Sequence, residues 1–234
     1  MIVYAGFFLD TLKEYANSEA FIIVDTLRFS TTVSYALKNI KRIYFSPDIN
    51  EAIDISRKRK IPLIAEVDGY RPIEADYDNS PSKMKEINAE EAVIRTTSGV
   101  YLLDYAIKLG LKNVFIGAIV NAKYIADFVK KFSTITIAMA GYRRKKIALD
   151  DLLGAGAIIS ELGNARLETD EAIIALELFK NSKENLFEKL KISNAGKFLV
   201  STGRENDVKI ASMLNSIDTV PKLEKEFLIN ASKI

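Results

Sequence analysis

The feature that most constrains the fold of this chain is the alternation of short apolar segments with segments of helical periodicity through its first two-thirds. Several apolar segments are nearly continuous in Ile, Val and Phe, which is typical of strands covered on both faces of a sheet. Strands that alternate with helices predict an α/β fold with a largely parallel or mixed central sheet. We expect strands at 2–8, 20–24, 42–45, 62–66, 92–95, 113–116 and 134–140, and helices at 31–39, 49–60, 101–109 and 122–131.

The last third of the chain has a different pattern, in which helical segments follow one another and the only strand signal, at 218–220, is weak. No internal repeat, low-complexity segment or Pro/Gly-rich linker separates this part from the rest. We therefore expect one domain over residues 1–234, with an α/β part at about 1–147 and a helix-rich part at about 148–234 packed on it. The helices predicted in the second part are 150–162, 169–179, 183–190 and 206–214.

Composition and charge favour a globular protein that acts on small molecules. The chain is 48% hydrophobic and 27% charged, with a formal net charge of +2. Such a small net charge gives no general attraction to nucleic acid or to an anionic membrane. No segment has the roughly 18 apolar residues of a membrane span, and the N-terminus has no signal-sequence pattern. We expect a cytoplasmic protein with no nucleic-acid or membrane partner.

The chain contains neither cysteine nor histidine. Disulfides, thiolate zinc sites, a cysteine nucleophile, phosphohistidine chemistry and imidazole metal ligands are therefore all excluded. An enzyme built from this sequence has to use carboxylates, Lys, Arg, hydroxyl groups and backbone amides. Carboxylates without imidazole or thiolate favour hard cations, and magnesium is the metal that we expect.

The sharpest polar segment is 24–32, Val-Asp-Thr-Leu-Arg-Phe-Ser-Thr-Thr, in which an apolar strand ends at Asp25 and hydroxyl residues begin a helix. Ligands of α/β sheets bind at the carboxyl ends of strands, where helix N-termini offer free amides to anions. Asp25 is then a candidate metal ligand, and Arg28 a candidate clamp for phosphate or carboxylate oxygens. The alternative is structural: Asp25 and Ser30 are also common helix caps, and Arg28 then lies at the surface.

Similar polar junctions recur along the chain. Residues 95–99, Arg-Thr-Thr-Ser-Gly, again follow a strand and precede a helix, and they suit either an anion cradle or an ordinary helix cap. Asn121 stands at a third strand-to-helix junction. Because three such junctions belong to one sheet, we interpret them together as a binding site.

The polar segment 66–83 follows directly on a predicted strand, which favours a functional loop. Magnesium uses only one or two protein carboxylates, so most acidic candidates cannot be ligands. The pair Asp150–Asp151 has a structural alternative, because acidic residues stabilise helix N-termini. The basic run 142–146 is typical of a solvated surface, but at the mouth of a cleft it would attract anions. The acidic candidates are Asp25, Glu66, Asp68, Asp76, Asp78, Asp150 and Asp151.

Taken together, these motifs resemble the 2-phosphosulfolactate phosphatase family, and they occur in order through most of the chain. Two positions depart from the usual family pattern: Ala65 precedes Glu66 where the family commonly has Gly, and Ser98 stands where it commonly has Asn. The 143–146 run is also more basic than is usual in the family. The resemblance rests on 24–32, Glu66 with Gly69, 76–81, 96–99, 121–122, Gly141, Asp150–Asp151 with Gly154 and Gly156, and Val220–Pro221.

The resemblance implies a three-layer α/β/α sandwich, a homodimer, and magnesium-dependent hydrolysis of 2-phospho-3-sulfolactate to 3-sulfolactate, a step toward coenzyme M. The departures leave open a closely related phosphorylated hydroxy acid as the substrate. We expect Asp25, Arg28 and Glu66 to be catalytic, and either a water activated by the metal or an Asp to attack phosphorus. The expected metal ligands are Asp25, Glu66, Asp76 and Asp151, and the expected substrate-binding residues are Ser30, Thr31, Asn79, Ser80, Thr96, Thr97, Ser98, Gly99 and Asn121.

Two other functions are compatible with parts of the sequence. The same sheet edge also fits a non-catalytic module that binds an anion or a nucleotide. The basic runs 57–60 and 142–146 also occur in proteins that bind nucleic acid, but they lack interleaved aromatic residues. A phosphate-ester substrate is therefore the expected partner.

Overall fold

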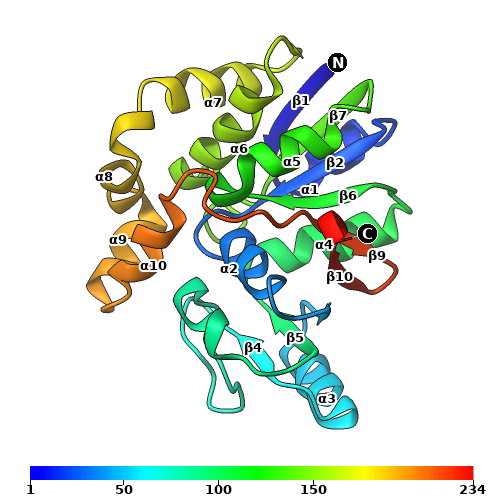
Figure 1. Ribbon diagram of the computed structural model, residues 1–234, viewed down its shortest axis with the longest axis vertical. Coiled ribbons are helices and arrows are strands. Elements are labelled where there is room, and N and C mark those ends of the chain that lie inside the picture. Colours follow the sequence, from blue (N-terminus) through cyan, green and yellow to red (C-terminus); the bar gives the residue numbers. More distant parts are fainter. Residues whose placement is uncertain (234) are drawn as a thin grey trace.

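The computed structural model, which describes residues 1–233, has a ten-stranded mixed sheet at its centre (Figure 1). Its strand order is β4-β5-β3-β10-β9-β6-β2-β7-β1-β8. The strands are β1 (Ile2–Phe7), β2 (Ala20–Val24), β3 (Arg42–Phe45), β4 (Leu63–Ala65), β5 (Glu91–Arg95), β6 (Val114–Gly117), β7 (Thr134–Met139), β8 (Arg166–Leu167), β9 (Pro221–Glu224) and β10 (Phe227–Asn230).

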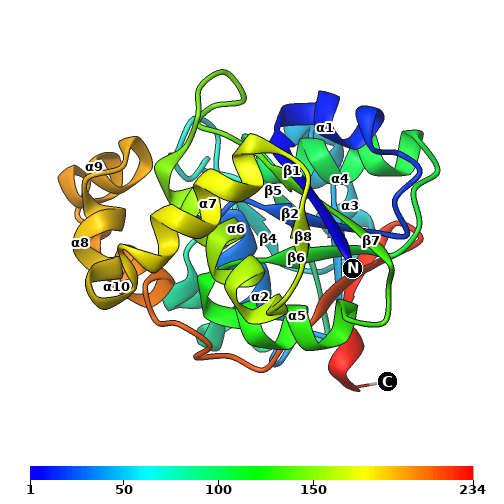
Figure 2. The same cartoon turned by 90° about the horizontal axis from the view of Figure 1, so that it is seen from above.

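Helices cover both faces of the sheet, so the expected α/β fold with three layers is confirmed (Figure 2). No helix within residues 1–233 has both the length and the apolar character needed to cross a membrane. The α-helices are α1 (Phe8–Glu14), α2 (Phe29–Ala36), α3 (Ile49–Arg59), α4 (Gly99–Lys108), α5 (Ala122–Val129), α6 (Leu149–Leu162), α7 (Asp170–Lys180), α8 (Leu186–Lys191), α9 (Asn194–Ser201) and α10 (Glu205–Ala211), and the 3-10 helices are η1 (Pro81–Glu86), η2 (Ile119–Asn121), η3 (Lys183–Asn185) and η4 (Ala231–Lys233).

Strand β2 shows how the sequence pattern builds the layers. Ile22 and Val24 pack into one buried cluster with α5, α6 and α7, whereas Phe21 and Ile23 pack into another cluster with α2 and α4. Successive side chains of a strand point to opposite faces. All five residues of β2 are buried, so the apolar run Ala-Phe-Ile-Ile-Val fits a strand covered on both sides.

The sheet consists of two parallel groups joined by the C-terminal hairpin. Strands β4, β5 and β3 form one parallel group, and β6, β2, β7, β1 and β8 form the other. The hairpin β9–β10 pairs antiparallel with β6 on one side and with β3 on the other. Helix α2 packs between the two groups, because its residues share a buried cluster with residues of β2 and of β5.

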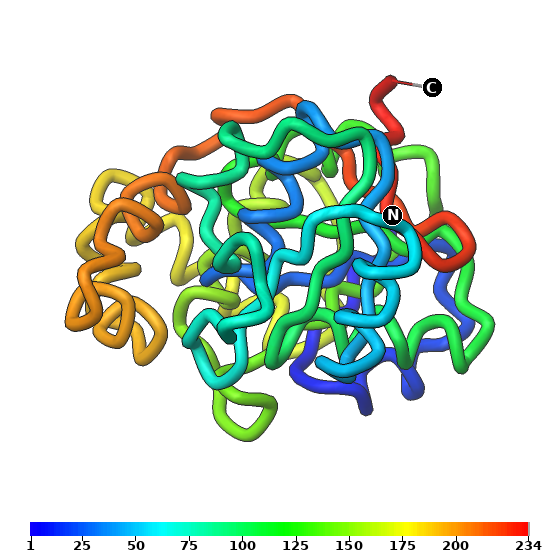
Figure 3. Tube along the Cα trace, turned by 90° about the horizontal axis from the view of Figure 1, so that it is seen from below, coloured from blue at the N-terminus to red at the C-terminus, as the bar shows by residue number. Residues whose placement is uncertain are grey.

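The helices α8, α9 and α10 form a lobe at one end of the molecule, beside the loop at 66–83 (Figure 3). Two contacts between the lobe and the 66–83 loop fix this arrangement. Tyr70 of the loop stacks edge-on against Phe198 of α9, with ring centroids 5.3 Å apart. Arg204 Nε, just before α10, lies 2.9 Å from Asp78 Oδ2 in the loop.

Most predicted elements occur within a few residues of their expected bounds, but the prediction of the C-terminal strand was wrong. The weak strand expected at 218–220 is irregular chain, and a hairpin of two strands follows it. The turn was not recognised because Lys225 adopts a positive φ of 58° where a Gly or Asn would be the usual signal. Helix α9 was not predicted, because Gly196 resembles a loop residue.

Candidate active site

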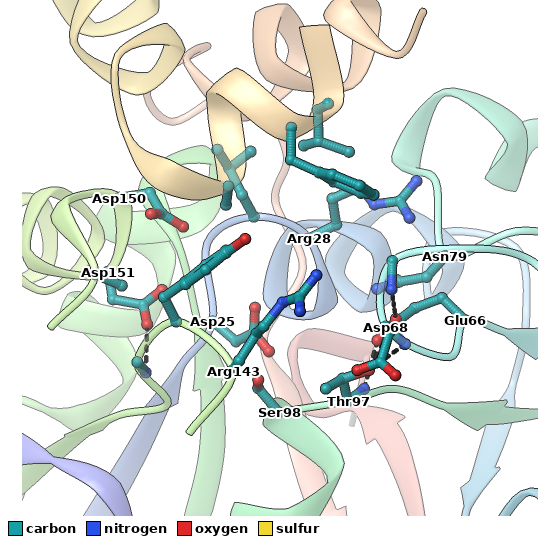
Figure 4. Close-up of a pocket in the computed structure, with 18 residues that line it drawn as sticks. Asp25, Arg28, Glu66, Asp68, Asn79, Thr97, Ser98, Arg143, Asp150 and Asp151 are labelled. Carbon is teal, nitrogen blue, oxygen red and sulfur yellow. Dashed lines mark hydrogen bonds between the residues drawn. The ribbon is translucent and has the colours of Figure 1, made fainter. Parts of the chain in front are cut away.

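One pocket collects the ends of several elements (Figure 4). It lies where the segments after β2, β4 and β5 meet the start of α6, the β7–α6 connection and helix α9. This agrees with the expectation that ligands bind beyond the carboxyl ends of strands. The lining residues are Asp25, Leu27, Arg28, Glu66, Asp68, Gly69, Asn79, Thr97, Ser98, Gly141, Tyr142, Arg143, Ala148, Asp150, Asp151, Ala195, Phe198 and Leu199.

Asp25 occupies the first position after β2 and is buried. Its Oδ2 accepts a hydrogen bond of 2.8 Å from the amide of Gly99, at the start of α4. Its own amide donates to the hydroxyl of Ser30 at 2.9 Å. Burial raises the pKa of Asp25 to about 7, and the negative charges of Asp150 and Glu66 add to the shift. Asp25 is therefore a buried carboxyl group that forms no ion pair with another residue in the part of the chain that the structure describes.

Asp150 and Asp151 lie in the first turn of α6 and have different surroundings. Both oxygens of Asp151 accept hydrogen bonds from backbone amides, Thr26 N at 2.9 Å and Gly141 N at 2.8 Å. Asp151 thus ties the end of β2 to the end of β7. Burial raises the pKa of Asp150 to about 6, and burial with the charges of Asp150 and Asp25 raises the pKa of Asp151 well above its usual range.

Glu66 is buried directly after β4, and its carboxylate organises the loop that follows. Oε2 accepts hydrogen bonds from Gly69 N at 2.6 Å and from the hydroxyl of Thr97 at 2.9 Å. Oε1 accepts from the amide of Thr97. Glu66 therefore joins the loop after β4 to the segment after β5, and both of its oxygens already accept hydrogen bonds.

Arg28 lines the pocket, but its charge is compensated by two carboxylates. Nη1 lies 2.8 Å from Asp78 Oδ2 and 3.0 Å from Asp207 Oδ2, and Nη2 donates to Asp78 Oδ1 at 3.2 Å. Asp207 also accepts hydrogen bonds from Ser80, at 2.6 Å, and from Ser82. The peptide bond between Leu27 and Arg28 is cis. The guanidinium thus connects the segment after β2 with the 66–83 loop and with α10.

Asn79 is 3% exposed and lines the pocket. Its Oδ1 is buried without a hydrogen-bond partner among residues 1–233. A buried amide oxygen without a partner costs free energy, which a ligand that donates a hydrogen bond recovers. Among the residues that the structure describes, Asn79 therefore has an unused acceptor oxygen at the pocket.

Several predicted site residues lie next to the pocket rather than in it. Gly99 contributes its amide to Asp25, and Ser30 accepts the amide of Asp25. Ser80 donates to Asp207. Thr96 is buried, and its hydroxyl accepts from Val100 N at 3.4 Å. These side chains support the residues that line the pocket.

Three further predicted residues lie elsewhere in the fold. Asp76 accepts a hydrogen bond from Leu63 N at 2.8 Å and is not among the pocket-lining residues. Thr31 donates to the carbonyl of Thr26. Asn121 is fully buried, where it donates to the carbonyls of Ile116 and Thr219 and accepts from Ala118 N. These side chains satisfy backbone groups at the ends of strands and loops.

The sequence indicated Asp150 as an acidic candidate but not as an expected metal ligand, indicated Arg143 only as part of the basic run, and did not predict helix α9; all three line the pocket. The sequence shows two adjacent acids at a helix start, but the better metal ligand of the two cannot be chosen without the structure. Arg143 was part of the basic run considered for attracting anions. Helix α9 had one usable signal, Ser193, whose hydroxyl caps the helix by accepting from Gly196 N at 2.9 Å.

The charges in the pocket fit a bound cation. Five carboxylates line it, against two guanidinium groups. No group of three or more Asp or Glu side chains within residues 1–233 is arranged to hold an ion without help. Magnesium needs only one or two protein carboxylates, with water and substrate oxygens completing its shell. Asp25 and Asp150 both line the pocket, and the charge of Asp150 contributes to the raised pKa of Asp25, so these two carboxylates are the candidates to hold such an ion.

Comparison with known proteins places the chain in a family. A model of the family described as 2-phosphosulpholactate phosphatase matches residues 7–226. The 2-phosphosulfolactate phosphatase of Methanocaldococcus jannaschii is 34% identical over 223 residues, covering 91% of this chain and 92% of the relative. A probable 2-phosphosulfolactate phosphatase of Carboxydothermus hydrogenoformans is 29% identical over 235 residues, covering 97% of each chain. These matches confirm the resemblance drawn from the motifs: the chain belongs to the 2-phosphosulfolactate phosphatase family.

Proposed function

We propose that this protein is a magnesium-dependent phosphatase that hydrolyses 2-phospho-3-sulfolactate to 3-sulfolactate and phosphate. The observation that carries this proposal is the pocket of five carboxylates at the strand ends, in a chain of this family. A closely related phosphorylated hydroxy acid is the alternative substrate, because Ser98 lines the pocket where the family commonly has Asn.

Asp25 and Asp150 are the residues that we propose to hold magnesium. The pKa of each is raised by burial, so both would carry charge more readily with a cation bound in the pocket. Bound magnesium would supply charge neutralisation for the phosphoryl oxygens. Asp151 and Glu66 are less suited as direct ligands, because each already accepts backbone hydrogen bonds through both oxygens.

The remaining polar residues position the phosphate ester. Ser98 lines the pocket beside the helix start at Gly99, and its hydroxyl is a hydrogen-bond donor for a phosphoryl oxygen. The Asn79 amide also lines the pocket and provides a second polar group for the substrate. Phosphoryl transfer depends mainly on positioning and charge stabilisation, so these groups suffice without histidine.

The proposal is tested by measuring phosphate release from a panel of esters that includes 2-phosphosulfolactate, in magnesium and in chelator. We expect release from 2-phosphosulfolactate in magnesium and loss of activity in chelator that added magnesium restores. Binding of the esters without phosphate release from any of them would instead identify a non-catalytic anion-binding module.

We also propose, from the family resemblance, that the protein acts as a cytoplasmic homodimer and that its reaction serves coenzyme M synthesis. Sedimentation analysis tests the oligomeric state. A mass of about 52 kDa, twice the 26.1 kDa of one chain, is expected, and a monomer would refute the dimer.

A further inference from the structure

The positive charges in the pocket are distributed unequally between its two arginines. Arg28 forms ion pairs with Asp78 and Asp207, so its charge is already balanced by two carboxylates. Arg143 forms no ion pair and no side-chain hydrogen bond with any other residue in the part of the chain that the structure describes. Arg143 is therefore the cation of this pocket that is available to an anionic ligand.

The loop after β7 holds Arg143 over the pocket. Its turn is closed by hydrogen bonds from Tyr142 N to Lys146 O at 2.8 Å and from Lys145 N to Tyr142 O at 3.2 Å. Arg143 and Arg144 have positive φ values of 51° and 58°, which are uncommon for residues other than glycine and often mark functional sites. The unusual backbone thus belongs to a turn that directs one arginine to the pocket.

The two arginines of the turn have separate roles. The Arg144 guanidinium stacks over the ring of Tyr101 in α4, 3.8 Å from its centroid, and so anchors the loop to the body of the protein. The exposed Arg143 side chain extends over the pocket, between Asp25 on one side and Asn79 on the other (Figure 4). Anchoring by one arginine fixes the position of the other.

A substrate with a phosphate and further acidic groups needs cations in two places. Asp25 and Asp150, the proposed metal ligands, both line the pocket, so the metal and the phosphoryl group that it would bind belong at the end of the pocket where α6 begins. A second acidic group of the substrate would be repelled by the other carboxylates of the pocket. A cation that faces this group would offset the repulsion. A guanidinium binds carboxylate or sulfonate oxygens through two parallel hydrogen bonds.

We propose that Arg143 determines substrate specificity by binding the non-reacting acidic group of the substrate, a carboxylate or a sulfonate, while the phosphoryl group lies at the carboxylate end of the pocket. This assignment rests on the proposed phosphatase function for the identity of the reacting group. It gives Arg143 the binding role that the sequence suggested for Arg28.

The kinetic test compares the wild-type protein with Arg143→Gln in magnesium. For 2-phosphosulfolactate we expect KM to rise about 10- to 100-fold, the usual effect of losing a charge-assisted pair, with kcat changed less than about 3-fold. For isopropyl phosphate, which has no second acidic group, KM should stay the same. An equal rise in KM for both esters would show that Arg143 binds phosphate and would overturn the proposal.

Two further variants separate direct contact from general electrostatic attraction. Lys145→Gln removes the same charge from the same exposed turn, outside the pocket lining, and should leave KM within about 2-fold because exposed charges are screened. Arg143→Lys should recover only part of the affinity, because an ammonium cannot form the two parallel bonds. Equal effects of Arg143→Gln and Lys145→Gln would contradict direct binding.

Whether Arg143 binds the sulfonate or the carboxylate is decided with 2-phospholactate, which has the carboxylate but no sulfonate. If Arg143→Gln raises KM for 2-phosphosulfolactate alone, Arg143 binds the sulfonate; if it raises KM for both, Arg143 binds the carboxylate. Calorimetry with 3-sulfolactate tests the subsite without turnover. Wild-type protein should bind it at least about 10-fold more tightly than Arg143→Gln, and equal affinities would refute the subsite even if the phosphatase proposal fails.

Discussion

Arg28 Nη1 lies 3.0 Å from Asp207 Oδ2, and this buried ion pair joins the segment after β2 to helix α10 across 179 positions of the chain. The same guanidinium pairs with Asp78 of the 66–83 loop. Three distant segments therefore meet at one side chain beside the pocket. The two ion pairs of Arg28 therefore fix the positions of these three segments relative to one another.

The Arg28–Asp207 pair should contribute strongly to stability. Replacing Asp207 by Asn leaves a buried guanidinium with one partner fewer and weakens the hydrogen bonds from Ser80 and Ser82. We expect the free energy of unfolding, measured in urea, to fall by about 3 kcal/mol. The control is Asp218→Asn, which breaks the exposed pair with Lys38 and should cost less than about 1 kcal/mol. Equal losses in the two variants would contradict a structural role for the buried pair.

The position of Asp25 depends on the absence of a side chain at residue 99. A Cβ on Gly99 would lie 2.2 Å from Phe29 Cδ1 and 2.9 Å from Asp25 Oδ2. Gly99→Ala should therefore displace Asp25 and lower kcat about 100-fold, since small misplacements of catalytic groups have effects of that size. Gly110→Ala is the matched control, because Gly110 has a positive φ and no atom of residues 1–233 lies within 4 Å of its Cβ position. That variant should lose some stability and keep its kcat; unchanged kcat in Gly99→Ala would refute the argument.

Asn79 lines the pocket, and its buried amide oxygen costs the folded protein free energy. Within residues 1–233 its Oδ1 is buried without a partner, so Asn79→Leu, which has a similar shape, removes an unsatisfied polar atom. We expect the melting temperature to stay the same or rise, while phosphate release falls at least about 10-fold. A variant that is both less stable and fully active would show that Asn79 serves the fold and not the ligand.

Stability without metal should depend on pH through Asp25. Its pKa is about 7 in the folded protein and about 3.9 when unfolded, so the folded state binds the proton more tightly. Protonated Asp25 therefore contributes on the order of 4 kcal/mol to the free energy of unfolding. This contribution is complete below about pH 4 and is lost as pH rises through about 7. In chelator, Asp25→Asn should therefore become increasingly more stable than the wild type between pH 5 and pH 8.

Melting temperatures measured at several pH values check this, and magnesium should raise the wild-type value most at the higher pH. Asp54→Asn, at an exposed position outside the pocket, is the control for replacing an Asp by Asn elsewhere in the protein. A constant difference between Asp25→Asn and the wild type would contradict the high pKa of Asp25.

The sequence predicted the layers of the fold well because strands such as β2 are apolar without interruption and are buried on both faces. It did not predict the β9–β10 hairpin, whose turn depends on the positive φ of Lys225. Helix α9 was missed because its glycine serves packing: a Cβ on Gly196 would lie 1.9 Å from the carbonyl oxygen of Leu190. Such close approaches between helices leave no periodic signal in the sequence.

The sequence predicted where the site lies, at the ends of the strands. It predicted the role of each residue there less well. Asp25, Glu66 and Ser98 all line the pocket, because polar residues after buried strands gather at one place. Arg28 also lines the pocket, but its partner Asp207 is 179 positions away, and such long-range pairs cannot be derived from one sequence. The choice between Asp150 and Asp151 likewise depends on which carboxylate receives the amides of Thr26 and Gly141.

The most direct test of a magnesium phosphatase centred on Asp25 is the rate of phosphate release from 2-phosphosulfolactate by wild-type protein and by Asp25→Asn, both in magnesium. We expect the wild type to release phosphate and Asp25→Asn to be about 1,000-fold slower, while its circular dichroism spectrum and melting curve show a folded protein. A folded Asp25→Asn variant that releases phosphate at nearly the wild-type rate would contradict the proposed role of this carboxylate.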